Sequence, residues 1–254
     1  MELRPLGRTG LRVSPIGLGT TKLGRTQALK YPEPFELPSD DQIRELLATA
    51  RGFGVNLIDT APAYGTSEER LGALLPNRSD WVIVTKAGEE FVDGRSHFDF
   101  SPAAVTRSVE RSLQRLRTDW LDVVLLHSSG DDLGILRDSG AVEALGELRE
   151  AGLIRAWGAS TKTVEGGLLA VELCEVVMVA LDRQDRSQLP VVEAARESGA
   201  GVLLKKPLAS GHDTDPGEAL VQALAVPGVS GVIVGTVDVE HWKDDCSAVE
   251  RALA

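Results

Sequence analysis

The sequence is poor in cysteine, in aromatic residues and in basic charge. Of its 254 residues, two are cysteine (Cys174 and Cys246) and 4% are aromatic. So few cysteines exclude a disulfide-stapled scaffold and indicate a reduced, cytoplasmic setting. With 27 basic against 38 acidic residues, the formal net charge is −11. Nucleic acid and anionic lipid repel such a surface, so we expect neither as a partner.

Long apolar runs and an apolar leader are also missing. No segment reaches the roughly 18 consecutive apolar residues of a membrane helix. Residues 1–5 lack the apolar core of a secretory signal. No low-complexity tract or composition change marks a domain boundary, so we expect one domain over residues 1–254.

The sequence does contain a regular alternation of short apolar runs and longer amphipathic stretches. Continuous apolar runs are typical of parallel strands buried on both faces. Eight such strands alternating with about eight helices predict either a closed barrel or an open doubly wound sheet. No Gly-x-Gly-x-x-Gly follows any strand, which favours an α/β fold of the (β/α)8 TIM-barrel type. The runs are residues 15–18, 55–58, 81–85, 121–126, 154–159, 176–181, 201–204 and 229–234.

Several boundaries of these elements carry local signals. Ser39 with Gln42 predicts a capping box at one helix start. Ser101 before Pro102 predicts another start, and Asp238 is the expected cap of the last helix. Near the N-terminus, the turn signal Thr9-Gly10 predicts a short hairpin that caps the bottom of the barrel.

Four ionisable residues stand at or just after the ends of consecutive predicted strands: Asp59, Tyr64, Lys86 and His127. Taken singly, each has an ordinary interpretation as a turn former, a packing residue, an exposed lysine or a core histidine. In a barrel, however, the carboxyl ends of neighbouring strands meet at one mouth, where TIM-barrel enzymes have their active sites. The coincidence at matched strand ends therefore favours a catalytic group.

The chemistry of this group suits carbonyl reduction. A carbonyl that receives hydride develops negative charge on oxygen and needs a proton donor, for which we propose Tyr64. We expect Lys86 to lower the pKa of Tyr64, Asp59 to pair with Lys86, and His127 to donate to the carbonyl oxygen. The hydride has to come from a cofactor, because no side chain supplies it. No metal is expected.

The residues around this group resemble the aldo-keto reductase family. The similar segments are residues 6–11, 17–20, 59–68 with 71–72, and 115–122 leading into His127. The sequence is similar to a short, bacterial-type member. The resemblance implies a (β/α)8 barrel, a monomer, an NADPH-dependent oxidoreductase acting on a small carbonyl or alcohol, and a catalytic tetrad of Asp59, Tyr64, Lys86 and His127.

The expected cofactor site is atypical for that family. Ser160 is kept where the family has a Ser-Asn pair, but Thr161 replaces the Asn, Met178 replaces a Gln, and Lys205 stands in place of an aromatic ring. NADPH is therefore the expected cofactor, with NADH as the alternative. The expected cofactor-binding residues are Gly19, Thr20, Asp59, Ser160, Thr161, Met178, Lys205, Lys206, Leu208, Ser210, Gly235, Thr236 and His241.

The substrate is not indicated by the sequence. Residues 24–38 and 89–100 form the expected loops at the mouth, and their aromatic side chains Tyr31, Phe35, Phe91 and Phe98 are the candidate substrate contacts. Two alternative functions stay open. One is a barrel that binds cofactor as a sensor or partner subunit with little turnover, and the other is a lyase in which Lys86 forms a Schiff base.

Overall fold

The structure, a computed structural model, describes residues 1–29 and 34–253. The eight predicted strands close into a barrel in which every neighbouring pair is parallel. The predicted TIM barrel is thus confirmed. In order around the barrel, the strands are β3 (Ile16–Gly19), β4 (Leu57–Asp59), β5 (Val82–Ala87), β8 (Leu121–His127), β9 (Ile154–Ser160), β10 (Val176–Ala180), β11 (Gly201–Lys205) and β12 (Gly231–Val234).

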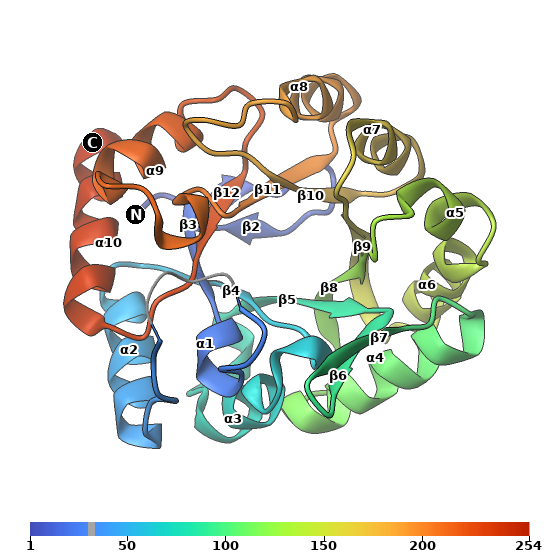
Figure 1. Ribbon diagram of the computed structural model, residues 1–254, viewed down its shortest axis with the longest axis horizontal. Helices are drawn as coiled ribbons and strands as arrows, with labels where there is room; N and C mark the ends of the chain where they lie inside the picture. The colour runs from blue at the N-terminus through green and yellow to red at the C-terminus, as the bar shows by residue number, and fades with distance from the viewer. Residues whose placement is uncertain (30–33, 254) are drawn as a thin grey trace.

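Helices form the outer ring around these strands, as Figure 1 shows. Within the described residues, no helix combines the length and the apolarity needed to cross a bilayer. The outer helices are α2 (Asp40–Gly52), α3 (Ser67–Leu74), α4 (Pro102–Leu116), α6 (Ala141–Glu150), α7 (Val164–Leu173), α8 (Leu189–Ser198), α9 (Pro216–Leu224) and α10 (Val239–Leu253). Shorter turns of helix are α1 (Thr21–Gly24), α5 (Asp132–Arg137), η1 (Pro62–Tyr64), η2 (Arg78–Asp80) and η3 (Ala209–Gly211).

The predicted helix starts are found where the sequence placed them. Ser39 and Gln42 form the reciprocal capping box of α2. Asp238 Oδ1 accepts from the backbone nitrogens of Glu240 and His241 at 2.8 and 3.0 Å, which caps α10. Ser101 precedes α4, but its side chain makes no capping hydrogen bond.

The bottom of the barrel is closed by the predicted hairpin of β1 (Arg4–Pro5) and β2 (Arg12–Val13). Leu6 and Val13 are fully buried and join the cluster of side chains inside the barrel. Leu6 packs so closely on Gly201, the first residue of β11, that a Cβ at position 201 would lie 2.8 Å from Leu6 Cδ1. This end of the barrel is therefore filled by packed side chains, and we expect the active site at the opposite end.

At the mouth, the structure differs from the expected loop over residues 89–100. A second hairpin stands there, formed by β6 (Glu89–Val92) and β7 (Arg95–Phe98) in antiparallel register. Asp93 and Gly94 at its tip have φ of 50° and 76°. Asp-Gly is a signal of a tight hairpin turn, so the local sequence accounts for this hairpin. The hairpin begins two residues after β5 and so extends the mouth beside Lys86.

Candidate active site

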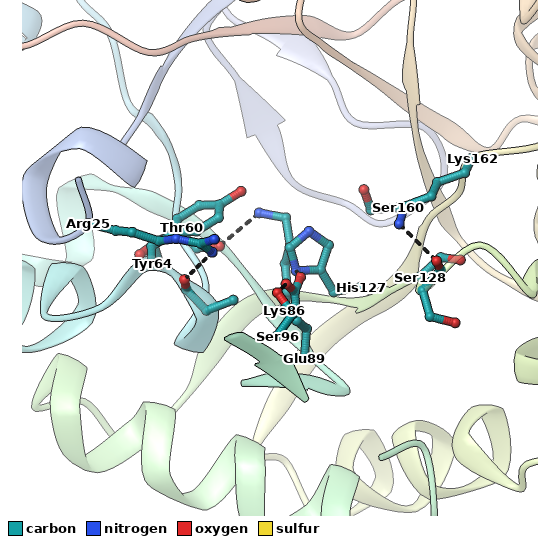
Figure 2. A network of polar contacts seen from close by, with 12 residues as sticks. Arg25, Thr60, Tyr64, Lys86, Glu89, Ser96, His127, Ser128, Ser160 and Lys162 are labelled. Carbon is teal, nitrogen blue, oxygen red and sulfur yellow. Dashed lines mark hydrogen bonds and ion pairs between the residues drawn. The ribbon is translucent and has the colours of Figure 1, made fainter. Parts of the chain in front are cut away.

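The four ionisable residues at the strand ends converge on one side of the mouth. Lys86 Nζ lies 2.6 Å from Asp59 Oδ1 and donates to the carbonyl oxygen of Thr60 at 2.9 Å. Tyr64 donates its hydroxyl to Asp59 Oδ2 at 3.4 Å, and Lys86 Nζ is 4.7 Å from the centre of the Tyr64 ring. The rings of Tyr64 and His127 meet edge to face, 6.2 Å apart. Figure 2 shows Tyr64, Lys86 and His127 facing one another, with Glu89 and Ser96 below His127 in this view.

Local backbone packing holds Tyr64 at this place. The turn η1 ends at Gly65, which has φ of 61° and approaches Gly24 so closely that a Cβ at position 65 would lie 2.1 Å from the Gly24 oxygen. Arg25 adds a hydrogen bond from Nη1 to the carbonyl oxygen of Ala63 at 3.0 Å. The loop that carries Tyr64 is thus locked to the end of α1.

The electrostatics of Tyr64 differ from our expectation. Burial raises the pKa of Tyr64, the Asp59 carboxylate raises it further, and the opposing effect of Lys86 is smaller. Lys86 does lower the pKa of Tyr64 as expected, but burial of the phenol and the Asp59 carboxylate outweigh this effect, so the net shift is upward. Burial is the largest single effect on the Lys86 ammonium and lowers its pKa, but the contacts with Asp59 and Tyr64 together outweigh burial and raise the pKa of Lys86. The resting site holds a neutral phenol beside an ion pair.

Glu89 is a site residue that sequence reasoning missed. Its Oε2 lies 2.7 Å from His127 Nδ1, and its Oε1 accepts from Ser96 Oγ at 2.6 Å. Although burial acts in the other direction, these contacts lower the pKa of Glu89 to about 2. Burial lowers the pKa of His127, and the contact with Glu89 opposes it. The available signal was the position of Glu89, a carboxylate three residues after Lys86 and beside the barrel mouth.

A second cation occupies the other side of the mouth. Lys205, at the end of β11, reaches across β10 to β9. There its Nζ donates to Ser160 Oγ at 2.8 Å and to the backbone carbonyl oxygen of Thr161 at 2.9 Å. Burial, followed by the charges of Lys206 and other lysines, lowers the pKa of Lys205 to about 7. Met178, in contrast, packs inside the barrel and is 1% exposed. The expected cofactor side thus carries a buried lysine that is hydrogen-bonded to the end of β9.

The other expected cofactor-binding residues follow the carboxyl ends of the strands. Gly19 ends β3, and the next residue, Thr20, donates its hydroxyl to the backbone carbonyl oxygen of Asp59 at 2.9 Å. His241 lies in the first turn of α10 with 77% of its side chain exposed. The loop after β11 holds Lys206, Leu208 and Ser210, and the segment after β12 holds Gly235 and Thr236.

The three candidate substrate contacts that the structure describes, Phe35, Phe91 and Phe98, each pack against a different partner. Phe91, on β6, packs under Arg25, whose guanidinium carbon is 3.4 Å from the ring centre. Phe98, on β7, is 41% exposed and stacks on Phe100. Phe35 lies 5.0 Å from Lys22 Nζ, and Tyr31 is outside the described residues. The aromatic side chains of the hairpin therefore border the mouth without forming a common aromatic wall.

Comparison with known proteins places the chain among reductases. The sequence model of the Aldo/keto reductase family matches residues 15–212 of the chain. A solved structure of a putative aldo-keto reductase from Pseudomonas aeruginosa superposes with a TM-score of 0.92 at 48% identity, covering 99% of this chain and 95% of that one. L-galactose dehydrogenase of Arabidopsis thaliana is 32% identical over 85% of this chain and 68% of its own length. The NADH-specific methylglyoxal reductase of Escherichia coli is 29% identical over 83% and 68%, respectively.

Proposed function

The chain belongs to the aldo/keto reductase family, and from this premise we propose that it reduces an aldehyde or ketone to the alcohol with NADPH, using Tyr64 as proton donor. As a member of that family, it is an NAD(P)H-dependent oxidoreductase of small carbonyl compounds. The role of Tyr64 and the preference for NADPH are the specific parts of the proposal.

The observation that carries this proposal is the buried Asp59–Lys86 pair beside the Tyr64 phenol. Lys86 is 2% exposed and Asp59 4%. A phenol with a raised pKa keeps its proton at neutral pH and releases it only to a stronger base. The alkoxide that forms when a carbonyl accepts hydride is such a base. As the proton leaves, the nearby Lys86 ammonium stabilises the charge on the Tyr64 oxygen.

The residues on the other side of the mouth fit a nicotinamide cofactor, which supplies the hydride. Thr161 Oγ1 is buried without a hydrogen-bond partner among the described residues, so it is available to a polar ligand. Lys205 has no carboxylate within ion-pair distance in the described part of the chain, and so it can face an anionic or amide oxygen of a ligand. With Lys206 nearby, this supports binding of a phosphate-rich nucleotide.

The preference between the two coenzymes is tested by direct binding. Four tryptophans provide the fluorescence signal for titrations with NADPH and with NADH. We expect NADPH to bind more tightly, since its 2′-phosphate adds negative charge that the basic side chains Lys206 and His241 attract. Tighter binding of NADH, the coenzyme in the name of the Escherichia coli relative, would contradict this part of the proposal.

The role of Tyr64 is tested with Tyr64→Phe. Loss of the proton donor is expected to lower kcat for reduction of a panel of aldehydes by about 10²–10⁴-fold. The cofactor Kd measured by the same titration should stay unchanged. A variant that keeps most of its activity would remove Tyr64 as the donor.

The two alternative functions, a Schiff-base lyase and a cofactor-binding sensor, receive different support from the site. A Schiff base requires an unprotonated Lys86, yet Asp59 lies 2.6 Å away and raises the pKa of Lys86, so the lyase alternative loses support. A sensor barrel would bind the nucleotide and show no turnover with any aldehyde of the panel. Turnover that depends on Tyr64 would exclude it.

A further inference from the structure

Lys205 combines a desolvated position with the absence of an acidic partner. Its Nζ donates to Ser160 Oγ at 2.8 Å and to the backbone carbonyl oxygen of Thr161 at 2.9 Å, and both acceptors are uncharged. Within the described residues, no carboxylate lies within ion-pair distance of this nitrogen. Lys86, by contrast, is neutralised by Asp59 at 2.6 Å. Of these two lysines, Lys205 is therefore the one whose ammonium form is not stabilised by an ion pair.

The two hydrogen bonds of Lys205 suit a neutral amine better than an ammonium. An ammonium has three N–H donors, and no third acceptor for Lys205 is found in the part of the chain that the structure describes. A neutral amine has two N–H donors, which match the two acceptors, and one lone pair. Because the nitrogen is tetrahedral, this lone pair points away from Ser160 and Thr161. The side chain of Lys205 is partly exposed, which gives a small molecule access to it.

The charges around Lys205 favour the amine as well. Burial, followed by the positive charges of three lysines, lowers the pKa of Lys205 to about 7. These lysines are Lys206, Lys86 and Lys162, and the Asp132 carboxylate acts in the opposite direction but is outweighed. At pH 7, about half of the Lys205 side chains are therefore amines. A lysine with the ordinary pKa of 10.5 is an amine in roughly one molecule of 3,000 at this pH.

Desolvation and neighbouring positive charge are two features that turn a lysine amine into a nucleophile toward carbonyl groups. We propose that Lys205 is a covalent binding site for small aldehydes, which its ε-amine captures reversibly as an imine. The lone pair of Nζ forms a bond to the carbonyl carbon, and the π electrons of the C=O bond move to oxygen. Both hydrogens of the amine then leave with that oxygen as water, so the step needs no oxidant or reductant.

Capture of an aldehyde at Lys205 is independent of the proposed reduction. Imine formation uses neither a nucleotide nor the proton of Tyr64, so a protein that binds no NADPH would still form the adduct. When the imine is protonated, it keeps one N–H, and Ser160 Oγ or the carbonyl oxygen of Thr161 can accept it. The end of β9 thus holds the nitrogen both before and after the aldehyde is bound.

Three other lysines of the chain serve as internal controls, because each lacks this combination of features. Lys86 is held in a buried ion pair with Asp59 at 2.6 Å. Lys243 pairs with a glutamate on the same face of α10 at 2.7 Å. Lys162 donates to a backbone oxygen at 3.0 Å in an exposed position, where water also reaches it. We expect all three control lysines to react slowly with aldehydes at neutral pH.

Reductive trapping of the purified wild-type protein, without added nucleotide, tests the proposal. The protein is incubated with propionaldehyde and sodium cyanoborohydride at pH 7, and fragmentation mass spectrometry locates the N-propyl groups over a short time course. We expect Lys205 to be labelled at least about 10-fold faster than the three control lysines, because its lower basicity offsets only part of its advantage in amine fraction. No label on Lys205, or labelling of the control lysines at the same rate, would overturn the proposal.

The pH dependence of labelling distinguishes Lys205 from a lysine that reacts only because it is accessible. Between pH 8 and 9, Lys205 is already an amine, whereas the amine fraction of an ordinary lysine such as Lys243 rises about 10-fold. The ratio of Lys205 label to Lys243 label should therefore fall by about 10-fold over this range, and the reducing conditions cancel in the ratio. A constant ratio would contradict the proposal.

Lys205→Met, with Lys243→Met as the matched control, completes the test. The fast phase of labelling should disappear in Lys205→Met and stay in Lys243→Met. A fast label that persists in Lys205→Met would place the reactive amine elsewhere and overturn the proposal. Because the site of labelling is mapped in the wild type, a loss of folding in either variant leaves the test intact.

Discussion

Breaking the buried pair of Asp59 and Lys86 should cost more stability than removing it. The two charged groups lie 2.6 Å apart, and their side chains are 5% and 2% exposed. Asp59→Asn leaves the Lys86 ammonium buried without a counter-charge, and Lys86→Met leaves the carboxylate in the same position. Each single change should lower the free energy of unfolding by about 3–5 kcal/mol. For a chain of this size, that corresponds to a fall in Tm of roughly 6–20 °C.

The double variant, Asp59→Asn with Lys86→Met, carries no buried charge at this place. We expect its loss of stability to be smaller than the sum of the two single losses by at least about 2 kcal/mol. Urea denaturation of the wild type and the three variants, followed by tryptophan fluorescence, measures the four free energies. Single losses below about 1 kcal/mol, or losses that add within about 0.5 kcal/mol, would refute the reasoning.

The pH dependence provides an independent check on the pair. The pKa of Lys86 in the folded protein is raised above its ordinary value of 10.5. Its contribution to stability is therefore fully present below pH 10.5 and is lost as pH rises through the folded value. The wild type should lose more stability in this alkaline range than the double variant does.

Four further changes test other parts of the structure. Gly24→Ala would place a Cβ 2.4 Å from the backbone carbonyl oxygen of Tyr64. It should lower the free energy of unfolding, measured by urea denaturation, by about 1–3 kcal/mol and should also lower kcat. Gly146→Ala, at a position in α6 with open space, should leave stability unchanged or raise it by up to about 1 kcal/mol. Burial raises the pKa of Asp245 to about 6, so its charge destabilises the fold progressively as pH rises from about 4 to 6. Asp245→Asn should accordingly raise the Tm at pH 7 and leave it unchanged at pH 4; equal gains at both would contradict this. Lys205 titrates at about 7, and its ammonium disfavours the cationic ring of NADP⁺. The ratio of NADPH to NADP⁺ affinity, measured by fluorescence titration, should fall between pH 6 and 8 in the wild type and stay constant in Lys205→Met.

The local pattern of the sequence was sufficient for the fold and for the reactive group. Continuous apolar runs marked all eight barrel strands, and Ser39 and Asp238 marked two helix starts. Asp59, Lys86 and His127 could be assigned to one mouth because parallel strands of a barrel end on the same face. These features depend on periodicity and on neighbours a few residues away, and a single sequence displays both.

Tertiary structure alone decided how those residues act on one another. The sign of the Tyr64 pKa shift depends on burial and on the balance between Asp59 and Lys86. The pairing of Glu89 with His127 depends on the β6–β7 hairpin, which brings Glu89 next to the end of β8. Likewise, the reach of Lys205 to Ser160 joins residues 45 positions apart. Desolvation and charge interactions vary with distance in space, and the chain order of the residues does not contain that distance.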